Sequence, residues 1–422
     1  MQHWQVRTSK SGRFTAVTSR FYATDLPRLF ATFNDPASWP MEAPERLIRI
    51  EHEQLLGFSF DNDTRVEISF SKVRPGLFRV DLIHEQLHDT DELQACKDYW
   101  DEILQSIFDR LLCEPVHAAV AFGKINLFFK VGPLLENGYH QVASLYQAVS
   151  LQETVIAELA ADWSVEVTGN IDESHRAAVP TNRNNLVVKA ARAAGEALGM
   201  KKIPRLAFTI NKNVPVAGGM GGGSADAAAA ILAAESAWGR QLTEFERYEV
   251  AAALGADVPF SLMGGSAIGV GTGHELSPVQ QKSELHWVLL PNDFGLSTPE
   301  VYAELDRLRS ERGVKVDAVK DASVSTALVR ALKAGASAED IAPLLHNDLQ
   351  EAAVSLRPEL QELLALGERA QALHAMVSGS GPTVALLARD ANDAIAVASR
   401  VTTFGREAII VSSPAGAAQL VY

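Results

Sequence analysis

The chain has 422 residues, of which 47% are hydrophobic and 21% charged, a composition typical of a globular protein of two or three domains. Its net charge is −14, and residues 1–113 (13 Lys and Arg against 18 Asp and Glu) and the remainder (25 against 34) are both acidic, which argues against a nucleic-acid-binding surface. Cys96 and Cys113 form neither a metal-binding spacing nor a disulfide framework, and no apolar run is long enough for a signal peptide or membrane span, so we expect a cytoplasmic protein.

Residues 1–113 form the first predicted unit. Residues 66–71 and 77–83 alternate apolar and polar side chains, which predicts two strands. An acidic first turn at Asp89 then begins a predicted helix whose apolar residues keep helical spacing. We therefore expect a long amphipathic helix that packs on a sheet and ends at a domain boundary at residues 112–115.

From residue 116 onward the pattern predicts an α+β organisation, with alanine-rich helices between short apolar strands. The chain alternates helices and strands again toward its C-terminus. The predicted strands lie at residues 116–131, 206–210, 286–290, 375–378 and 384–387, and the predicted helices at residues 184–199, 224–238 and 243–254.

A glycine-rich loop precedes the second of these helices. Five of the six residues 218–223 are glycine, and the predicted helix starts near Ser224. Backbone N–H groups of successive glycines can converge on an anion, and a helix N-terminus adds partial positive charge, so the loop is predicted to bind a nucleotide phosphate. Taken alone, the run could equally be a flexible loop or a close helix contact. Neither a Walker A sequence nor a Rossmann fingerprint accompanies it.

Four further blocks occur with this loop, at residues 123–128 (GKINLF), 137–140 (NGYH), 254–259 (LGADVP) and 378–383 (SGSGPT). Their order and spacing resemble the motifs of the GHMP kinases over residues 116–422. The resemblance implies an α+β, two-domain GHMP kinase fold, with a ribosomal protein S5 domain 2-like N-lobe at residues 116–280 and a ferredoxin-like C-lobe at residues 281–422. It also implies ATP and Mg²⁺ as cofactors.

Two residues are expected to carry the chemistry, Lys124 and Asp257. The resemblance implies that Asp257 accepts the proton of the attacking hydroxyl and that Lys124 stabilises the transferring group electrostatically. In isolation the same residues could be a strand lysine on a surface and a turn carboxylate before a proline. Asn126 lies two residues after Lys124, hence on the same face of a strand, and could bind the substrate hydroxyls or orient Asp257.

The glycine loop and a second glycine-bearing turn are expected to hold the nucleotide. Ser224 is also the expected magnesium ligand. Asn185 is either near the adenine pocket or a helix N-cap, and both interpretations stay open. The implied ATP-binding residues are Pro215, Ala217, Gly218, Gly219, Met220, Gly221, Gly222, Gly223, Ser224 and Asn185, and the turn that would close over the phosphate is Ser378, Gly379, Ser380 and Gly381.

At Tyr139 and His140, which alone could be a simple loop with a packed aromatic ring, the resemblance implies an acceptor that carries cytosine, with the ring stacked on Tyr139 and its polar edge bound by His140. The implied small-molecule substrate is 4-(cytidine 5′-diphospho)-2-C-methyl-D-erythritol, phosphorylated on its 2-hydroxyl in the non-mevalonate isoprenoid pathway. A homoserine- or mevalonate-type GHMP kinase is the alternative, although those acceptors have no cytosine. The chain departs from the family at Phe122 and Gly123, where proline and alanine are usual.

The N-terminal unit contains a zinc-like signature at residues 84–88 (HEQLH). Zinc binding by this signature requires both imidazoles on one face of a helix, whereas here the segment continues a predicted strand, so we expect no zinc site.

Residues 46–112 resemble the C-terminal part of START-like, helix-grip domains related to the activator of the heat-shock chaperone ATPase. The resemblance implies an accessory α+β domain over residues 1–113, which could have an unidentified ligand or partner of its own. A second class of function is therefore a binding or adaptor protein whose START-like domain carries the function.

Overall fold

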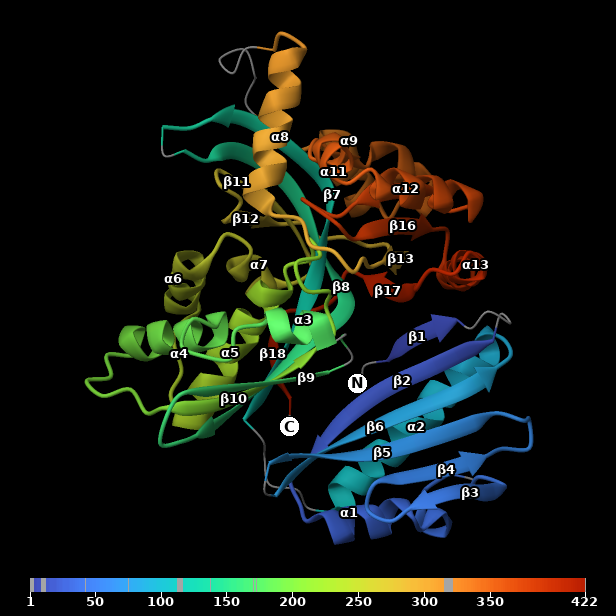
Figure 1. The fold of residues 1–422 in the computed structure, drawn as a ribbon. Coiled ribbons are helices and arrows are strands. Elements are labelled where there is room, and N and C mark those ends of the chain that lie inside the picture. The colour runs from blue at the N-terminus through green and yellow to red at the C-terminus, as the bar shows by residue number, and fades with distance from the viewer. Residues whose placement is uncertain are drawn as a thin grey trace. The chain divides into compact units, whose positions relative to one another are not determined.

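The computed structural model describes all residues except 1–3, 9–12, 42, 75, 112–116, 137, 170, 172, 315–321 and 422. The chain divides into two compact units, Met1–Val116 with Ala398–Ile410 and His117–Val397 with Val411–Tyr422 (Figure 1). The predicted boundary at residues 112–115 lies outside the described residues. None of the described helices combines the length and the apolar character that crossing a membrane requires.

The N-terminal unit is built on a six-stranded antiparallel sheet. Its strands, in their order across the sheet, are β1 (Gln5–Thr8), β2 (Phe14–Tyr22), β6 (Leu77–Leu87), β5 (Arg65–Arg74), β4 (Leu55–Ser59) and β3 (Arg46–Glu51). Two short helices, α1 (Leu26–Phe33) and the 3-10 helix η1 (Pro36–Ser38), connect β2 to β3, and the long helix α2 (Thr90–Leu111) lies along one face of the sheet (Figure 1). The strands predicted at residues 66–71 and 77–83 are confirmed as parts of β5 and β6.

Helix α2 begins where the sequence predicts it. The backbone N–H of Glu92 donates to the Asp89 carboxylate at 2.9 Å, which satisfies one of the free donors of the first turn. The buried residues recur every three or four positions and so share one face of the helix. They are Leu93, Cys96, Trp100, Ile103, Leu104, Ile107 and Leu111. This apolar stripe explains why the helix packs on the sheet.

His84, from the zinc-like signature, is a buried residue of strand β6. Trp100 Nε1 donates to His84 Nδ1 at 2.9 Å, so the ring proton lies on Nε2, which is 2.8 Å from Thr64 Oγ1. Burial lowers the pKa of His84 to about 4, and the ring is therefore neutral near pH 7. The predicted strand is confirmed, and His84 serves as the centre of a hydrogen-bonded packing contact.

A large mixed sheet forms the first half of the second unit. Its strands are β12 (Glu275–Pro278), β11 (Ser266–Val270), β8 (His140–Leu159), β10 (Leu206–Lys212) and β9 (Ser164–Gly169) in that order, while β7 (Ala118–Leu134) pairs with β8, β14 (His346–Asn347) and β18 (Gln419–Val421). Strands β14 and β18 come from residues 281–422, so the predicted C-terminal domain contributes two strands to the larger sheet.

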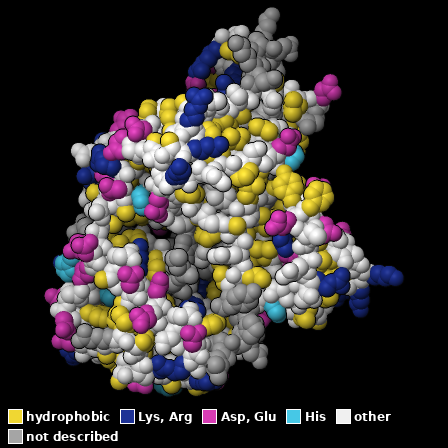
Figure 2. Space-filling view, turned by 180° about the vertical axis from the view of Figure 1, so that it is seen from behind, with side chains coloured by type: hydrophobic (Ala, Val, Ile, Leu, Met, Phe, Trp, Pro, Cys, Tyr) yellow, Lys and Arg dark blue, Asp and Glu magenta, His cyan; other side chains and the backbone are white. Residues whose placement is uncertain are grey.

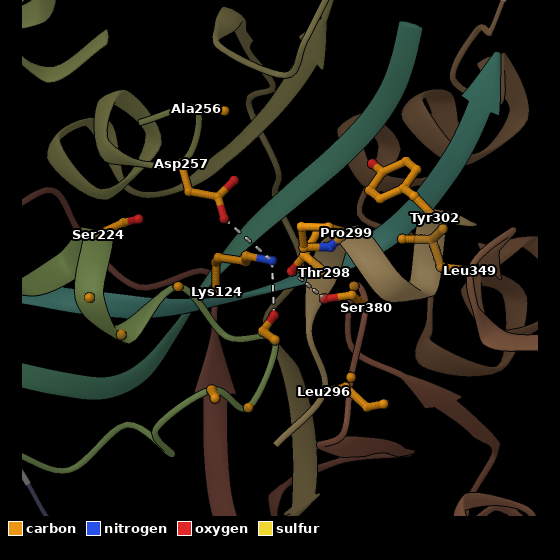
Figure 3. A pocket seen from close by; sticks show the side chains of 18 of the residues that line it. Lys124, Ser224, Ala256, Asp257, Leu296, Thr298, Pro299, Tyr302, Leu349 and Ser380 are labelled. Carbon is orange, nitrogen blue, oxygen red and sulfur yellow. Dashed lines mark hydrogen bonds and ion pairs between the residues drawn. The ribbon is translucent and has the colours of Figure 1, made fainter. Parts of the chain in front are cut away.

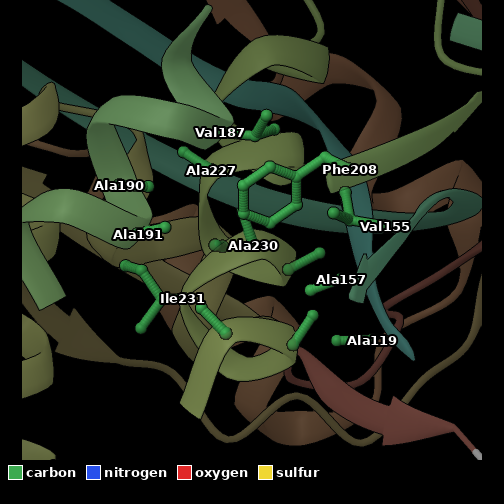
Figure 4. Packing of buried hydrophobic residues seen from close by; sticks show 14 of the residues in the cluster. Ala119, Val155, Ala157, Val187, Ala190, Ala191, Phe208, Ala227, Ala230 and Ile231 are labelled. Atoms are coloured by element: carbon green, nitrogen blue, oxygen red, sulfur yellow. The ribbon is translucent and has the colours of Figure 1, made fainter. Parts of the chain in front are cut away.

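Helices cover this sheet. The three predicted alanine-rich helices are confirmed as α4 (Leu186–Ala197), α5 (Gly222–Trp238) and α6 (Glu244–Leu254), and two short helices, α3 (Glu173–Ala178) and α7 (Val258–Met263), accompany them. Helix α5 is apolar on nearly all sides and is buried between α4 and the strands, where Ala227, Ala230 and Ile231 contact the core (Figure 4). Small side chains allow helix and sheet to approach closely, which fixes the N-terminus of α5 with respect to β7, β8 and β10.

A four-stranded sheet follows, with the order β15 (His374–Val377), β16 (Val384–Ala388), β13 (Leu285–Leu290) and β17 (Ile409–Ser413), and β16 pairs antiparallel with both β15 and β13. If the four strands are numbered 1 to 4 as they follow one another in the chain, their order across the sheet is 2-3-1-4. This is the strand order of a ferredoxin-like fold, so the predicted fold of the C-lobe is confirmed. The accompanying helices are α8 (Thr298–Glu311), α9 (Thr326–Ala334), α10 (Ala338–Ile341), the 3-10 helix η3 (Ala342–Leu344), α11 (Gln350–Leu356), α12 (Glu359–Arg369) and α13 (Ala391–Thr403).

On the face drawn in Figure 2, acidic and basic side chains are interspersed over the surface. Mixed charges on this face and the net charge of −14 provide no broad positive surface, so a bound polyphosphate would have to be held by groups next to it.

Candidate active site

The glycine-rich loop connects β10 to α5 and needs glycine at defined positions. Gly219 and Gly221 have φ angles of +75° and +69°, which favour glycine, and Gly221 is the N-cap of α5. A Cβ atom on Gly219 would lie 2.2 Å from the backbone oxygen of Ser378. The loop therefore presents its backbone at the N-terminus of a long helix, which is a suitable arrangement for binding an anion.

A cavity of about 1020 Å³ opens beside this loop. Its volume is at the upper end of the range for ligand pockets, and it brings most of the predicted site residues together. The predicted residues that line it are Lys124, Tyr139, His140, Asn185, Pro215, Ala217, Gly218, Gly219, Gly221, Gly222, Gly223, Ser224, Asp257, Gly379, Ser380 and Gly381. Asn126, Met220 and Ser378 do not line it but lie buried directly behind it.

Lys124 and Asp257 face each other across the cavity (Figure 3). Lys124 Nζ lies 3.8 Å from Asp257 Oδ2 and donates to Asn126 Oδ1 and to the Gly219 backbone oxygen, both at 2.9 Å. The lysine is buried on β7, and the aspartate is half-buried at the start of α7. The predicted shared face of Lys124 and Asn126 is thus confirmed, and the three contacts fix the ammonium group beside the glycine loop.

The residues behind this pair include one that the sequence analysis missed, Tyr146 of β8. Its ring centroid is 5.9 Å from Lys124 Nζ, and Asn126 Nδ2 donates to the neighbouring Ser144 Oγ at 2.7 Å. Burial, assisted by the charge of Asp257, raises the pKa of Tyr146 well above its ordinary value, so its hydroxyl stays protonated. Ser144 and Tyr146 are two residues apart and so share one face of β8, which is a signal that the sequence contains. To place that face beside Lys124, however, one must know that β8 pairs with β7.

The second glycine turn meets the first. Ser378 Oγ donates to the Gly219 backbone oxygen at 3.2 Å, and Asn347 Nδ2 donates to the Gly379 backbone oxygen at 2.8 Å. A Cβ on Gly379, whose φ is +57°, would lie 3.3 Å from Lys124 Nζ. The turn therefore closes one side of the cavity next to the lysine.

Tyr139 and His140 lie on another side of the cavity and differ in exposure. Tyr139 is 67% exposed, whereas His140 is buried and stacks on the ring of Tyr302. The two ring nitrogens of His140 lie 3.0 Å from Asp306 Oδ2 and 3.2 Å from the Gly132 backbone oxygen. Asp306 and Tyr302, both on α8, are residues that sequence reasoning missed. Asn137 of the same motif lies outside the described residues.

Asn185 is confirmed as a helix N-cap, whereas its place near an adenine pocket stays a prediction. Its Oδ1 accepts the backbone N–H of Val187 at 2.9 Å, so it is the N-cap of α4, and it also lines the cavity.

Gly123, where the chain departs from the family pattern, packs tightly at the start of the glycine loop. A Cβ there would lie 3.2 Å from Val214. The preceding residue, Phe122, packs with the cluster around Tyr146 and Phe260.

A glycine loop at a helix N-terminus, a buried lysine and a facing aspartate in one cavity are the parts that a phosphoryl-transfer enzyme requires. Comparison with known families agrees with this class. The family models described as "GHMP kinases N terminal domain" and "GHMP kinases C terminal" match residues 185–265 and 328–407.

Curated relatives match a longer stretch of the chain. A 4-diphosphocytidyl-2-C-methyl-D-erythritol kinase of Paenarthrobacter aurescens is 44% identical over 302 residues, which cover 71% of this chain and 94% of the relative. The enzyme of the same name from Clavibacter michiganensis subsp. michiganensis is 46% identical over 307 residues, covering 72% of this chain and 96% of the relative. The chain therefore belongs, among the GHMP kinases, to the family of 4-diphosphocytidyl-2-C-methyl-D-erythritol kinases.

Solved structures agree with this assignment. A crystal structure of 4-(cytidine 5′-diphospho)-2C-methyl-D-erythritol kinase superposes with a TM-score of 0.56 at 27% identity, covering 71% of this chain and all of the other. A mevalonate kinase of L. major reaches a TM-score of 0.53 at 15% identity, covering 69% of this chain and 95% of the other, and so shares the fold.

Proposed function

We propose that this chain transfers the terminal phosphoryl group of ATP to the 2-hydroxyl of 4-(cytidine 5′-diphospho)-2-C-methyl-D-erythritol. The observation that carries the proposal is the Lys124–Asp257 pair, which lies in one cavity with the glycine loop and with Tyr139. A cavity of about 1020 Å³ has room for a nucleotide and for a second, nucleotide-bearing molecule. The relatives at 44–46% identity carry the name of this activity, which supports it over the homoserine or mevalonate alternatives.

The glycine loop fits ATP, because Gly219 and Gly221 adopt left-handed backbone conformations that expose N–H groups at the start of α5. A bound Mg²⁺ would supply charge neutralisation on the phosphates. Among the described residues there is no group of three or more His, Cys, Asp or Glu placed to hold a metal ion. The ion would therefore be held largely by the phosphates, with Ser224, the third residue of α5, as its protein ligand.

In the proposed reaction, the acceptor oxygen forms a bond to the terminal phosphorus as the bond from phosphorus to the ADP oxygen breaks. Asp257 accepts the proton of the attacking hydroxyl. Lys124, fixed by Asn126 and the Gly219 backbone oxygen, stabilises the negative charge of the transferring group. Tyr139 offers an exposed ring for cytosine, and the buried His140 is oriented beside it by Asp306.

The test is ATP consumption by the purified chain with a panel of acceptors. We expect turnover with the cytidine-bearing alcohol, none with homoserine or mevalonate, and competitive inhibition by free CDP against the alcohol. Turnover of mevalonate or homoserine, or insensitivity to CDP, would contradict the proposed acceptor.

A further inference from the structure

A second cluster of charged side chains, which the reaction scheme does not use, lies beneath the glycine loop. Lys212 Nζ, at the end of β10, is 2.5 Å from Glu153 Oε1 on β8 and 2.8 Å from Asp226 Oδ2 on α5. The residues are 2%, 0% and 5% exposed, respectively. Lys212 and Asp226 line the same cavity as the loop. The cluster is called the buried triad below.

The buried triad holds both ends of the glycine loop. At its start, the backbone N–H of Asn213 donates to Glu153 Oε2 at 2.9 Å. At its end, a Cβ on Gly222 would lie 3.1 Å from Glu153 Oε1 and 3.2 Å from Lys212 Nζ, so the first residue of α5 rests directly on the ion pair. One carboxylate therefore contacts the residues on both sides of the loop.

One ammonium group in the buried triad faces two carboxyl groups, so its charges balance only while one of the two carboxyl groups is protonated. Burial raises the pKa of Glu153 to about 8, more than the ion pair with Lys212 lowers it, and burial also raises the pKa of Asp226. Asp226 Oδ1 is buried with no hydrogen-bond partner among the described residues. Buried ion pairs of this kind contribute little net stability compared with apolar packing, so stability alone does not account for them.

The loop itself requires external constraint. Ala217 adopts a φ of +52°, a conformation that residues with a Cβ rarely take, and Gly219 and Gly221 also have positive φ. A strained segment keeps one conformation when its ends are fixed by the surrounding structure.

We propose that Glu153, Lys212 and Asp226 are positioning residues that hold the glycine loop in its nucleotide-binding conformation. This inference rests on the proposed function, because the loop is taken to bind ATP. Removing the cation would release both ends of the loop and leave the buried Asp226 carboxylate near the phosphates without a counter-ion, so ATP affinity should fall while the acceptor side of the cavity is unaffected.

The chain offers a matched control at the other end of α5. Glu235 is a buried glutamate that pairs with Arg247 at 2.9 Å and accepts the backbone N–H of Leu242. It shares the chemistry of Glu153 and the same helix as Asp226, but it does not line the cavity. A purely structural role for the triad predicts the same consequences for both sites.

The experiment compares the full-length wild type with Lys212→Met, Glu153→Gln and Glu235→Gln. Binding of the non-hydrolysable analogue adenylyl imidodiphosphate with Mg²⁺ is measured by calorimetry, together with thermal unfolding and the KM for each substrate. We expect Lys212→Met to weaken analogue binding and raise the ATP KM by about tenfold, with the acceptor KM unchanged within about twofold. Glu153→Gln, which keeps an oxygen for the Asn213 N–H, should change ATP binding less and reports on the site even if Lys212→Met fails to fold.

Glu235→Gln should lower the unfolding temperature without changing either KM. The inference is overturned if the triad variants bind the analogue as the wild type does, or if ATP affinity falls equally in Glu235→Gln. If the wild type binds the analogue but phosphorylates no cytidine-bearing alcohol, the proposed acceptor is refuted. The comparison of analogue binding among the variants would still test the role of the buried triad. A wild type that does not bind the analogue would overturn both.

Discussion

The N-terminal unit and the kinase unit each contain a buried polar cluster, and the two clusters differ in charge and in hydrogen bonding. His84 is neutral, and both of its ring nitrogens have hydrogen-bond partners in Thr64 and Trp100. The buried triad of the kinase unit places a charged Lys212 between two carboxyl groups, and Asp226 Oδ1 has no hydrogen-bond partner among the described residues. A neutral, fully hydrogen-bonded cluster is compatible with packing alone, whereas a buried ion pair with an unpartnered oxygen next to a cavity indicates a functional site.

The largest effect on activity is expected in the kinase unit, at Asp257. Replacing it with asparagine in Asp257→Asn keeps the shape but removes the proton acceptor, so kcat should fall by about 10²–10⁴-fold. Analogue binding and thermal unfolding should stay close to those of the wild type, since the residue is half-buried at a helix start. Normal turnover by this variant would remove the assignment of the base.

A backbone effect comes next, at Gly219. In Gly219→Ala the new Cβ would collide with the Ser378 backbone oxygen at 2.2 Å, and its φ of +75° is unfavourable for alanine, so the ATP KM should rise by about tenfold or more. The control is Gly239→Ala at the C-cap of α5, which also has positive φ but no atom within 4 Å. If steady-state kinetics show the same ATP KM in both variants, the close approach of the two glycine turns is not required for nucleotide binding.

The N-terminal cluster predicts an acid-sensitive stability. The pKa of His84 is about 4 in the folded chain against 6.5 in the unfolded chain, so between these values the unfolded state binds a proton that the folded state excludes. The free energy of unfolding is therefore not reduced by His84 above about pH 6.5, and it falls by about 1.4 kcal/mol per pH unit as the pH drops from there toward about 4.

Hydrogen exchange of peptides from α2 should show this loss, and His84→Gln should reduce it. An equal loss of protection in the variant would show that other groups cause the acid sensitivity.

The smallest effect is expected from deleting residues 1–116. The 302 residues aligned with the Paenarthrobacter relative make up 94% of that enzyme, so the N-terminal unit has little counterpart there. We therefore expect the kcat of the shortened chain to stay within about twofold of the wild type. Loss of turnover in a folded, shortened chain would show that the N-terminal unit takes part in catalysis and is not merely an accessory domain.

Much of the architecture and site could be predicted because it depends on local spacing. The glycine loop before α5, the shared face of Lys124 and Asn126, and the capped start of α2 at Asp89 each depend on residues close together in the sequence. Contacts between distant segments could not be predicted in this way. Tyr146, the Asp306 partner of His140, and the pairing of β14 and β18 with β7 all require knowledge of which strands and helices meet.

The buried triad shows the same limit. Lys212, Glu153 and Asp226 lie on three different elements, and each one alone reads as an ordinary charged residue. Their significance depends on burial and on their contact with both ends of the loop, which only the folded chain provides.

The position of the phosphate on the product tests the central claim most directly. The purified chain is incubated with ATP, Mg²⁺ and 4-(cytidine 5′-diphospho)-2-C-methyl-D-erythritol, and the phosphorus–carbon couplings in the NMR spectrum of the product locate the new phosphate. The account predicts one new phosphomonoester, on the 2-hydroxyl. Phosphate on another hydroxyl, or no product with an enzyme that binds ATP, would contradict it.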